Sequence, residues 1–452
     1  MLGIKNGMVM QRNCSNLSEI TVISEQEILS AQFYSKDKRG EIAVEFIGNN
    51  KYILRGIPVG GPYTVSIFGE HYTDIYVGDL WILAGQSNME GAGWLEEEDY
   101  KSPCDNEIRA LYMTDEWGIA KNPLHELWKA KDKVHTEVFH AQPPEGEQFR
   151  GVGPGLTFAK RMKELTGGVP QGLLCCAHGG TSMADWSEKK KIQGPDKSLY
   201  AAMQRRFIAN GANAKGMFWF QGCADAFECT GDLFTERMKS FMAAFHKDFG
   251  NIPTIQVQIS RVVHEKLEGL EENWIKIREA QRLIPEQIDN IYTISSINKT
   301  TDDLIHLSRE AQIQLGKEGA EAMYYALYGN ADYGFIPPPE LHKITRVKTL
   351  KSGDVMIRVY FKNLYGGLKS LGRPNGFSLT HYQYKNDTEM IYDTRLANDF
   401  VELRTTLKDD EIRNLYLYYG FGLNPYCNIT DMKDRALLAF GPISISDIPE
   451  EI

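Results

Sequence analysis

Between residues 77 and 330 the sequence alternates short apolar runs with longer amphipathic stretches. The apolar runs have the composition of buried strands, whereas stretches such as PGLTFAKRMKEL (154–165) and DLFTERMKSFMAAF (232–245) have helical spacing. This alternation implies parallel strands joined by crossover helices, so we predict an α/β domain over residues 77–330. The predicted strands are 80–85, 169–179, 215–222, 253–260 and 291–297.

The two ends of the chain have a different pattern. Residues 1–76 contain short β-rich runs separated by glycine, asparagine and aspartate, which predicts a small N-terminal β domain. A proline-rich junction at 337–340 precedes a second series of β-rich runs, so we predict a C-terminal β domain over residues 331–452. A chain of 452 residues is long enough for these two or three domains.

Charge and cysteine usage exclude some classes of partner. The net charge of −10 argues against a nucleic acid or an anionic membrane, both of which bind basic surfaces. The sequence contains no run of about 20 apolar residues, the length that a membrane span needs. Its first residues lack the apolar core of a secretory signal, and its cysteines lack the spacing of a disulfide framework. We therefore expect a cytoplasmic protein. The seven cysteines are Cys14, Cys104, Cys175, Cys176, Cys223, Cys229 and Cys427.

Segment 95–152 is polar and irregular in pattern, and it lies between the first predicted strand and the next predicted helix. Ligands of open α/β sheets bind outside the carboxyl ends of the strands. We expect this segment to form one wall of a binding site, and surface decoration is the alternative.

Ser87 is the first candidate for catalysis. It follows the apolar run 80–85 in the sequence Gly85-Gln86-Ser87-Asn88-Met89. A serine at the carboxyl end of a strand, where the chain turns into a helix, presents its hydroxyl at the mouth of the sheet. Backbone N–H groups at such a turn are available to bind an oxyanion.

A serine hydroxyl needs a base, and the base needs a group that orients it. The candidate pair lies in Asp302-Asp303-Leu304-Ile305-His306, just before the last predicted helix. An aspartate three residues before a histidine can reach its Nδ1, which leaves Nε2 to accept the serine proton. The alternative is a solvated aspartate and a histidine that packs near the helix.

Two further predicted strand ends carry hydrogen-bond donors. His178, Gly179 and Gly180 follow one apolar run, and Gln221 follows another. A glycine N–H, the Gln221 side-chain amide and the N–H of Ser87 together would make an oxyanion hole with three donors.

Together these blocks resemble the sialate O-acetylesterase-like branch of the SGNH/GDSL hydrolases. The matching stretches are GDLWILAGQSNMEG (78–91), GGTSMADW (179–186), WFQG (219–222) and DLIH (303–306), and the match extends through 6–12, 151–162, 273–281 and 424–431. The resemblance implies a three-layer, flavodoxin-like α/β hydrolase with a parallel sheet, flanked by β-sandwich-like regions.

The same resemblance implies roles for individual residues. Ser87, Asp303 and His306 would form a catalytic triad, and Gly179 or Gly180 would complete the oxyanion hole together with Gln221.

One departure from the family pattern concerns the block after WFQG. Relatives often have a glutamate where this chain has Cys223, and that glutamate has been proposed as the catalytic acid in some of them. Its absence favours Asp303 as the orienting carboxylate, with Asp225 as a structural or substrate-side acid. A cysteine nucleophile at Cys223 has no evident histidine partner.

Other candidate residues support weaker alternatives. Trp186 follows the glycine block and would either stack on a sugar ring or support the loop from the core. Four histidines lack the tight spacing of metal ligands, so we expect scattered surface or core positions for them. They are His125, His135, His140 and His178.

The sequence thus predicts a carboxylic ester hydrolase that removes acetyl groups from carbohydrates. Its mechanism would pass through an acyl-enzyme and require no metal or organic cofactor. The expected substrate is an acetylated mono- or oligosaccharide. An esterase for acetylated xylan or mannan oligosaccharides and a non-catalytic carbohydrate-binding protein are the alternatives.

Overall fold

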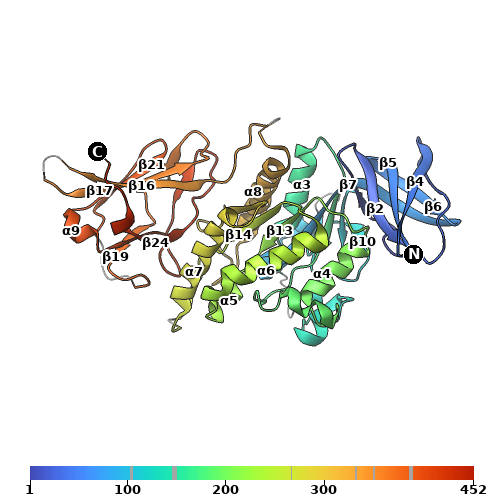
Figure 1. Ribbon diagram of the computed structural model, residues 1–452, viewed down its shortest axis with the longest axis horizontal. Helices are drawn as coiled ribbons and strands as arrows, with labels where there is room; N and C mark the ends of the chain where they lie inside the picture. The colour runs from blue at the N-terminus through green and yellow to red at the C-terminus, as the bar shows by residue number, and fades with distance from the viewer. Residues whose placement is uncertain are drawn as a thin grey trace. The chain divides into compact units, whose positions relative to one another are not determined.

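The computed structural model describes residues 1–101, 105–144, 150–265, 267–330, 333–349, 352–385 and 390–451 (Figure 1). It forms two compact units, each made of several chain segments. The first comprises 1–221, 236–254 and 306–324, and the second comprises 222–235, 255–305 and 325–452. No helix within these described ranges is long and apolar enough to cross a membrane.

Strand β7 (Glu70–Gly85) is the central strand of the first unit. Its first half pairs antiparallel with β6 (Gly60–Ile67), and its second half pairs parallel with β12 (Gln171–Cys175) and β13 (Gly216–Phe220). Every residue from position 75 to position 85 is buried. The predicted boundary between residues 76 and 77 therefore falls inside a continuous strand, and the three-domain division stays a prediction.

The parallel part of this sheet runs in the order β9, β12, β7 and β13, with β10 (Trp117–Ile119) antiparallel at the β9 edge. Strand β9 (Ile108–Leu111) corrects the prediction that segment 95–152 is irregular. It is only four residues long and contains Arg109, whose guanidinium donates to the Gly7 carbonyl and pairs with Asp74. A short strand that carries a charge lacks the continuous apolar run by which buried strands are recognised.

The rest of segment 95–152 and the residues beside it form short elements. These are β8 (Gly93–Trp94), α2 (Glu97–Lys101), the 3-10 turn η1 (Leu127–Lys129), the π turn η2 (Val134–Val138) and β11 (Arg150–Val152), which pairs with β8.

Helices cover both faces of the parallel strands, as two neighbouring residues of β13 show. Phe218 packs against Phe158 of α3 (Gly155–Leu165), with ring centroids 5.2 Å apart, and lies under Gly319 of α8 (Arg309–Tyr328). Trp219 packs against Phe241 of α6 (Gly231–Phe249) at 4.8 Å. Neighbouring side chains of a strand point to opposite faces, so α3 and α8 lie on one face and α6 on the other.

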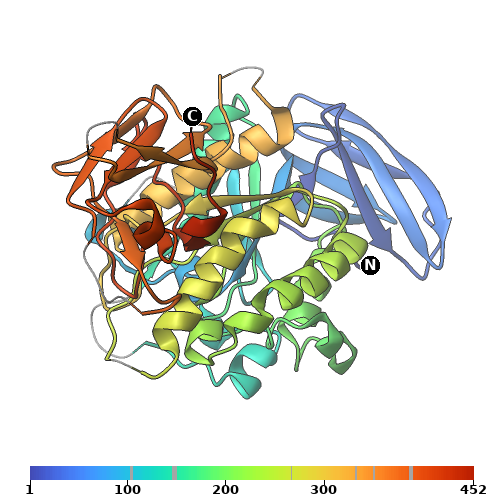
Figure 2. The same cartoon turned by 60° about the vertical axis from the view of Figure 1, so that its left-hand side comes forward.

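Helix α4 (Leu199–Ile208) lies beside α6, as Figure 2 shows, and Tyr200 contacts Phe241 edge-on. The short 3-10 turn η3 (Glu188–Gln193) precedes α4.

The N-terminal segment forms the predicted β structure. Its strands follow the order β7, β6, β3, β4, β5 and β2, all antiparallel, and β1 pairs parallel with β7. Alternate side chains of these strands, including Val22, Leu54 and Val65, form one apolar cluster. The bounds are β1 (Val9–Gln11), β2 (Leu17–Ile23), β3 (Ala31–Tyr34), β4 (Arg39–Gly48) and β5 (Lys51–Pro58).

The second unit contains further helices and the C-terminal β structure. Arg278 of α7 (Leu270–Leu283) is buried and donates to the carbonyls of Gly420 and Gly422, which ties this helix to the C-terminal segment. The other elements are α5 (Cys223–Phe227), β14 (Thr254–Gln258), η4 (Ile284–Glu286) and β15 (Ile291–Ser295).

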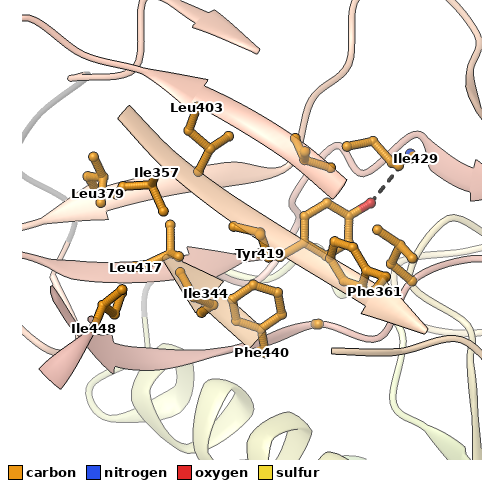
Figure 3. Close-up of a cluster of buried hydrophobic side chains, with 14 of the residues drawn as sticks. Ile344, Ile357, Phe361, Leu379, Leu403, Leu417, Tyr419, Ile429, Phe440 and Ile448 are labelled. Atoms are coloured by element: carbon orange, nitrogen blue, oxygen red, sulfur yellow. Dashed lines mark hydrogen bonds between the residues drawn. The ribbon is translucent and has the colours of Figure 1, made fainter. Parts of the chain in front are cut away.

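Two antiparallel sheets share one apolar core in the C-terminal region (Figure 3). Ile357 and Leu403 come from one sheet, and Leu417 and Phe440 come from the other. The first sheet has the order β16 (Glu340–Lys348), β17 (Val355–Lys362), β21 (Phe400–Arg404) and β20 (Asp393–Leu396). The second has the order β19 (Phe377–Thr380), β22 (Tyr416–Tyr419) and β24 (Phe440–Ser444). Strands β18 (Leu368–Ser370) and β23 (Ile429–Asp431), helix α9 (Asp409–Ile412) and turn η5 (Ile445–Asp447) complete the region.

The close contact of α8 with α3 yields a stability prediction. A Cβ added at Gly316 would overlap the Pro154 carbonyl oxygen and lie 2.9 Å from Thr157 Cβ. Overpacking of this kind costs about 1–3 kcal/mol, more than the roughly 1 kcal/mol that alanine gains over glycine inside a helix. Gly316→Ala should therefore lower the free energy of unfolding in a denaturant titration. Lys317→Ala, an exposed change on the same helix, is the control and should leave it nearly unchanged.

Candidate active site

The chain turns sharply at the carboxyl end of β7. Gly85 has a φ of 126°, and a Cβ there would overlap the backbone of Phe220 at the end of β13. The next N–H, that of Gln86, donates to the Phe220 carbonyl at 2.8 Å. Ser87 then begins the single-turn helix α1 (Ser87–Glu90), which leaves its side chain half-buried at the mouth of the sheet. This geometry requires glycine at position 85.

His306 lies against Ser87 although 219 residues separate them in the sequence. Its Nε2 is 2.9 Å from the serine Oγ. This distance suits a hydrogen bond in which the imidazole accepts the hydroxyl proton. The structure therefore brings together the two residues that the sequence singled out as nucleophile and base.

Asn88 holds the segment that carries His306, and sequence reasoning missed this role. Its buried Oδ1 accepts the N–H of Leu307 at 2.9 Å and the side-chain amide of Gln312 at 3.1 Å. Position 88 directly follows the serine in the first matching block, which was the signal available in the sequence.

The predicted acids lie in the second unit. Asp303 accepts the N–H of Ile305 on Oδ1 at 2.8 Å, so its carboxylate shapes the turn before His306. Asp225 is buried in α5, where its Oδ1 lies 3.4 Å from the Thr230 hydroxyl. The role of Asp303 as the orienting carboxylate stays a prediction.

The glycine block follows β12 and passes close to the nucleophile. The N–H of His178 donates to the Gly85 carbonyl at 2.9 Å, which fixes this loop against the end of β7. The N–H of Gly179 donates to Glu90 Oε2 at 2.6 Å, so a carboxyl group already engages this candidate donor. Gly180 has a φ of 69°, and a Cβ there would face open space.

Gln221 lies fully buried at the end of β13. Its Nε2 donates to the Thr181 carbonyl at 3.1 Å, which ties this strand end to the glycine block. An amide nitrogen carries two N–H groups, so this bond does not by itself decide a role in an oxyanion hole.

Three of the four histidines considered as metal ligands are buried near the glycine block. Nδ1 of His135 lies 2.8 Å from Nδ1 of His178, and Nδ1 of His125 lies 2.9 Å from the Glu90 carbonyl. Burial lowers the pKa of His178 to about 4 and that of His125 to about 3, so both are neutral at pH 7. Throughout the described ranges, no three or more His, Cys, Asp or Glu side chains are arranged to hold a metal ion.

Arg150 also lies at the site, and its place in a polar loop was the only signal for it in the sequence. Its guanidinium stacks on the Trp94 ring at 4.4 Å from the centroid. Nη1 lies 3.3 Å from His306 Nδ1 and 3.4 Å from the Ala92 carbonyl. A permanent cation thus lies beside the nitrogen of His306 that does not face Ser87.

Comparison with known proteins identifies the family of this chain. The sequence model of the carbohydrate esterase family described as sialic acid-specific acetylesterase matches residues 77–325. The chain belongs to this family. The resemblance inferred from the motifs is thereby confirmed. A search of curated proteins found no match.

Two similar solved structures cover different shares of this chain. A carbohydrate acetylesterase from Xanthomonas citri matches over 97% of this chain and 98% of its own, with a TM-score of 0.70 at 19% identity. A protein from Arabidopsis thaliana covers 55% of this chain and 99% of its own, with a TM-score of 0.42 at 25% identity. The first match supports a carbohydrate esterase fold with a large mixed sheet and flanking antiparallel sheets.

Burial decides two alternatives left open by the sequence, a nucleophilic thiolate at Cys223 and a sugar-stacking role for Trp186. Burial raises the pKa of the Cys223 thiol to about 12, so this side chain is not a thiolate at neutral pH. Trp186 is fully buried, donates to the Thr181 hydroxyl at 2.9 Å and packs edge-on against Trp219. It supports the loop from the core and is not available to stack on a sugar.

Cysteine reactivity tests this description of Cys223. Among the free cysteines of the described residues, two are exposed, Cys14 and Cys229. The others are buried, namely Cys175, Cys176, Cys223 and Cys427. Cys104 lies outside the described residues. Iodoacetamide should alkylate Cys14 and Cys229 quickly, and Cys223 slower by on the order of 10³-fold, because only the thiolate reacts. Peptide mapping by mass spectrometry measures each rate, with unfolded protein as the control. Rapid alkylation of Cys223 in folded protein would contradict its burial.

Proposed function

We propose that the protein is a carbohydrate O-acetylesterase that uses Ser87 as nucleophile and His306 as general base. The observation that carries this proposal is the 2.9 Å contact between Ser87 Oγ and His306 Nε2 at the carboxyl edge of a parallel sheet. Membership of a carbohydrate esterase family supports an acetyl ester as the bond that is cleaved.

In the proposed reaction Ser87 Oγ attacks the acetyl carbonyl carbon while its proton passes to His306 Nε2. The carbonyl electron pair moves to the oxygen and forms a tetrahedral oxyanion. When the oxyanion collapses, the bond to the sugar oxygen breaks, and His306 returns the proton to that oxygen. Water then attacks the acetyl-serine with the same histidine as base, and acetate is released.

Backbone and side-chain donors around Ser87 would stabilise the oxyanion. The proposed set is the N–H of Ser87, the N–H of Gly179 or Gly180, and the amide of Gln221. Two observations support it, namely the hydrogen bond from His178 N to Gly85 O and the bond from Gln221 to Thr181. These contacts hold three adjacent strand ends around the nucleophile. The proposed arrangement is that of an SGNH hydrolase. Its proposed triad has Asp303 as the third member.

The proposed substrate is an acetylated mono- or oligosaccharide. Glu96, Glu98 and Asp99 form an acidic cluster in the first unit, where Asp99 pairs with Arg309 at 2.8 Å. This ion pair offsets part of the cluster's negative charge. A sugar that carries a carboxylate is a second candidate substrate, because the Arg150 guanidinium lies 3.3 Å from His306.

Removal of the nucleophile and of the base tests the proposed function. Ser87→Ala and His306→Ala should each lower the rate of acetate release by about 10³-fold or more, and the double variant should lose little more than either single variant. Non-additivity is expected because the two groups act in the same step. Acetate release from a panel of acetylated saccharides measures the loss, and thermal melting checks that each variant folds.

Two outcomes would contradict the proposal. A double variant that loses the product of the two single effects would show that the residues act independently. A wild-type protein that binds acetylated saccharides without releasing acetate would instead be a carbohydrate-binding protein.

Substitution of the acids tests the third member of the triad. Asp303→Asn keeps the shape of the side chain but removes the charge that would stabilise the imidazolium, so kcat should fall by about 10²-fold or more. Asp302→Asn and Cys223→Ser are the matched controls and should have far smaller effects. If Asp303→Asn retains most of its activity, Asp225 becomes the next carboxylate to substitute.

A further inference from the structure

The carboxyl group of Glu90 contacts the glycine block beside the helical turn that carries the nucleophile. Glu90 ends the helical turn that Ser87 begins, and its Oε2 accepts the Gly179 N–H at 2.6 Å. A Cβ added to Gly179 would lie 2.9 Å from this oxygen and 3.4 Å from the Ser87 Cβ. The reaction described above assigns no role to this carboxyl group.

Its charge matters for the oxyanion that forms on Ser87. An ionised carboxylate holds a backbone N–H more strongly than a neutral acid does, because the hydrogen bond is charge-assisted. A carboxylate beside the developing oxyanion would also repel it. A protonated Glu90 would hold Gly179 less tightly and would carry no repelling charge.

The surroundings of Glu90 place its ionisation near neutrality. Burial raises the pKa of Glu90 to about 7, although the Gly179 hydrogen bond offsets part of the shift. The histidines on the neighbouring segments do not titrate in this range: burial lowers the pKa of His125, which contacts the Glu90 backbone carbonyl, to about 3 and that of His178 to about 4. Burial also places the pKa of His135, the partner of His178, well below its usual value.

Two further charged or titratable groups adjoin this part of the site. Arg150 bonds to the Ala92 carbonyl and lies beside His306, and its guanidinium stays charged at every pH of interest. His306 contacts Ser87 and is the proposed general base, which accepts the serine proton in its neutral form.

We propose that Glu90 is a positioning residue that must be protonated before the Gly179 N–H can serve the oxyanion. The carboxylate form engages this donor and opposes negative charge on the substrate, whereas the acid form releases the donor. The inference rests on the proposed esterase reaction. It requires activity to decline on the alkaline side, in the opposite sense to the titration of a histidine base.

The experiment measures kcat/KM for acetate release from an acetylated monosaccharide between about pH 5.5 and about pH 9. Wild type should lose activity above about pH 7, approaching tenfold per pH unit for a single ionisation. Glu90→Gln cannot ionise, and its neutral amide oxygen holds the Gly179 N–H without charge assistance, as the acid form does, so this variant should remain active to the alkaline end. Glu236→Gln, a change at an exposed glutamate of α6, is the matched control and should keep the wild-type profile. An unchanged alkaline decline in Glu90→Gln would overturn the proposal.

Thermal melting in the inactive Ser87→Ala background separates this inference from the esterase assignment. An unfolded glutamate ionises near pH 4.5, whereas native Glu90 keeps its proton to about pH 7. The stability that this proton contributes is fully present below pH 4.5 and is lost as the pH rises through about 7. As the pH increases from 4.5 to about 7, the melting temperature of Ser87→Ala/Glu90→Gln should therefore rise relative to that of Ser87→Ala. A difference independent of pH would show that native Glu90 is already ionised, and the proposal would fail even if the esterase assignment holds.

Discussion

The backbone pairing of β7 with β12 on one edge and β13 on the other determines where Ser87, the glycine block and Gln221 lie. Leu83 pairs with Cys175, and Gly85 pairs with Phe220, so the three strands end at nearly the same level. The turn to Ser87, the glycine block and Gln221 follow these ends directly. A shift of this pairing by one residue would move the strand ends out of line with the turn that carries the nucleophile.

This pairing brings backbones close together, and glycine makes the approach possible. A Cβ at Gly78 would overlap the Pro170 carbonyl that precedes β12, and a Cβ at Gly85 would overlap Phe220. Only Gly85 has a positive φ, so Gly78 is required by contact alone, whereas Gly85 is required by contact and conformation. The backbone donors of the site are therefore positioned by the sheet itself, before any side chain contributes.

The sequence was sufficient to predict the alternating α/β pattern and to select Ser87 and His306, because both residues follow recognisable motifs at strand or loop ends. It was not sufficient to find β9, where Arg109 interrupts an already short apolar run. Neither the stacking of Arg150 on Trp94 nor the bond from Gly179 to Glu90 leaves a local pattern, since each joins residues more than 50 positions apart. The continuity of β7 was hidden for a different reason. Its first half is antiparallel and exposed whereas its second half is buried, so one strand has two hydrophobic patterns.

The ionisable side chains of His125, His178 and Glu90, around the glycine block, are largely uncharged up to about pH 7. Their lack of charge bears on the oxyanion that forms in acyl transfer. Burial keeps His125 and His178 neutral and delays the ionisation of Glu90 to about pH 7, as shown by the direction in which burial shifts each pKa. Fixed dipoles stabilise a developing oxyanion best where neighbouring anions are few, because an adjacent negative charge cancels their effect. In the proposed role of Gly179 as an oxyanion donor, the carboxyl group of Glu90 would oppose the developing negative charge once it loses its proton. The pH dependence that we propose for Gly179 would therefore follow from the desolvation of Glu90 at this edge of the sheet.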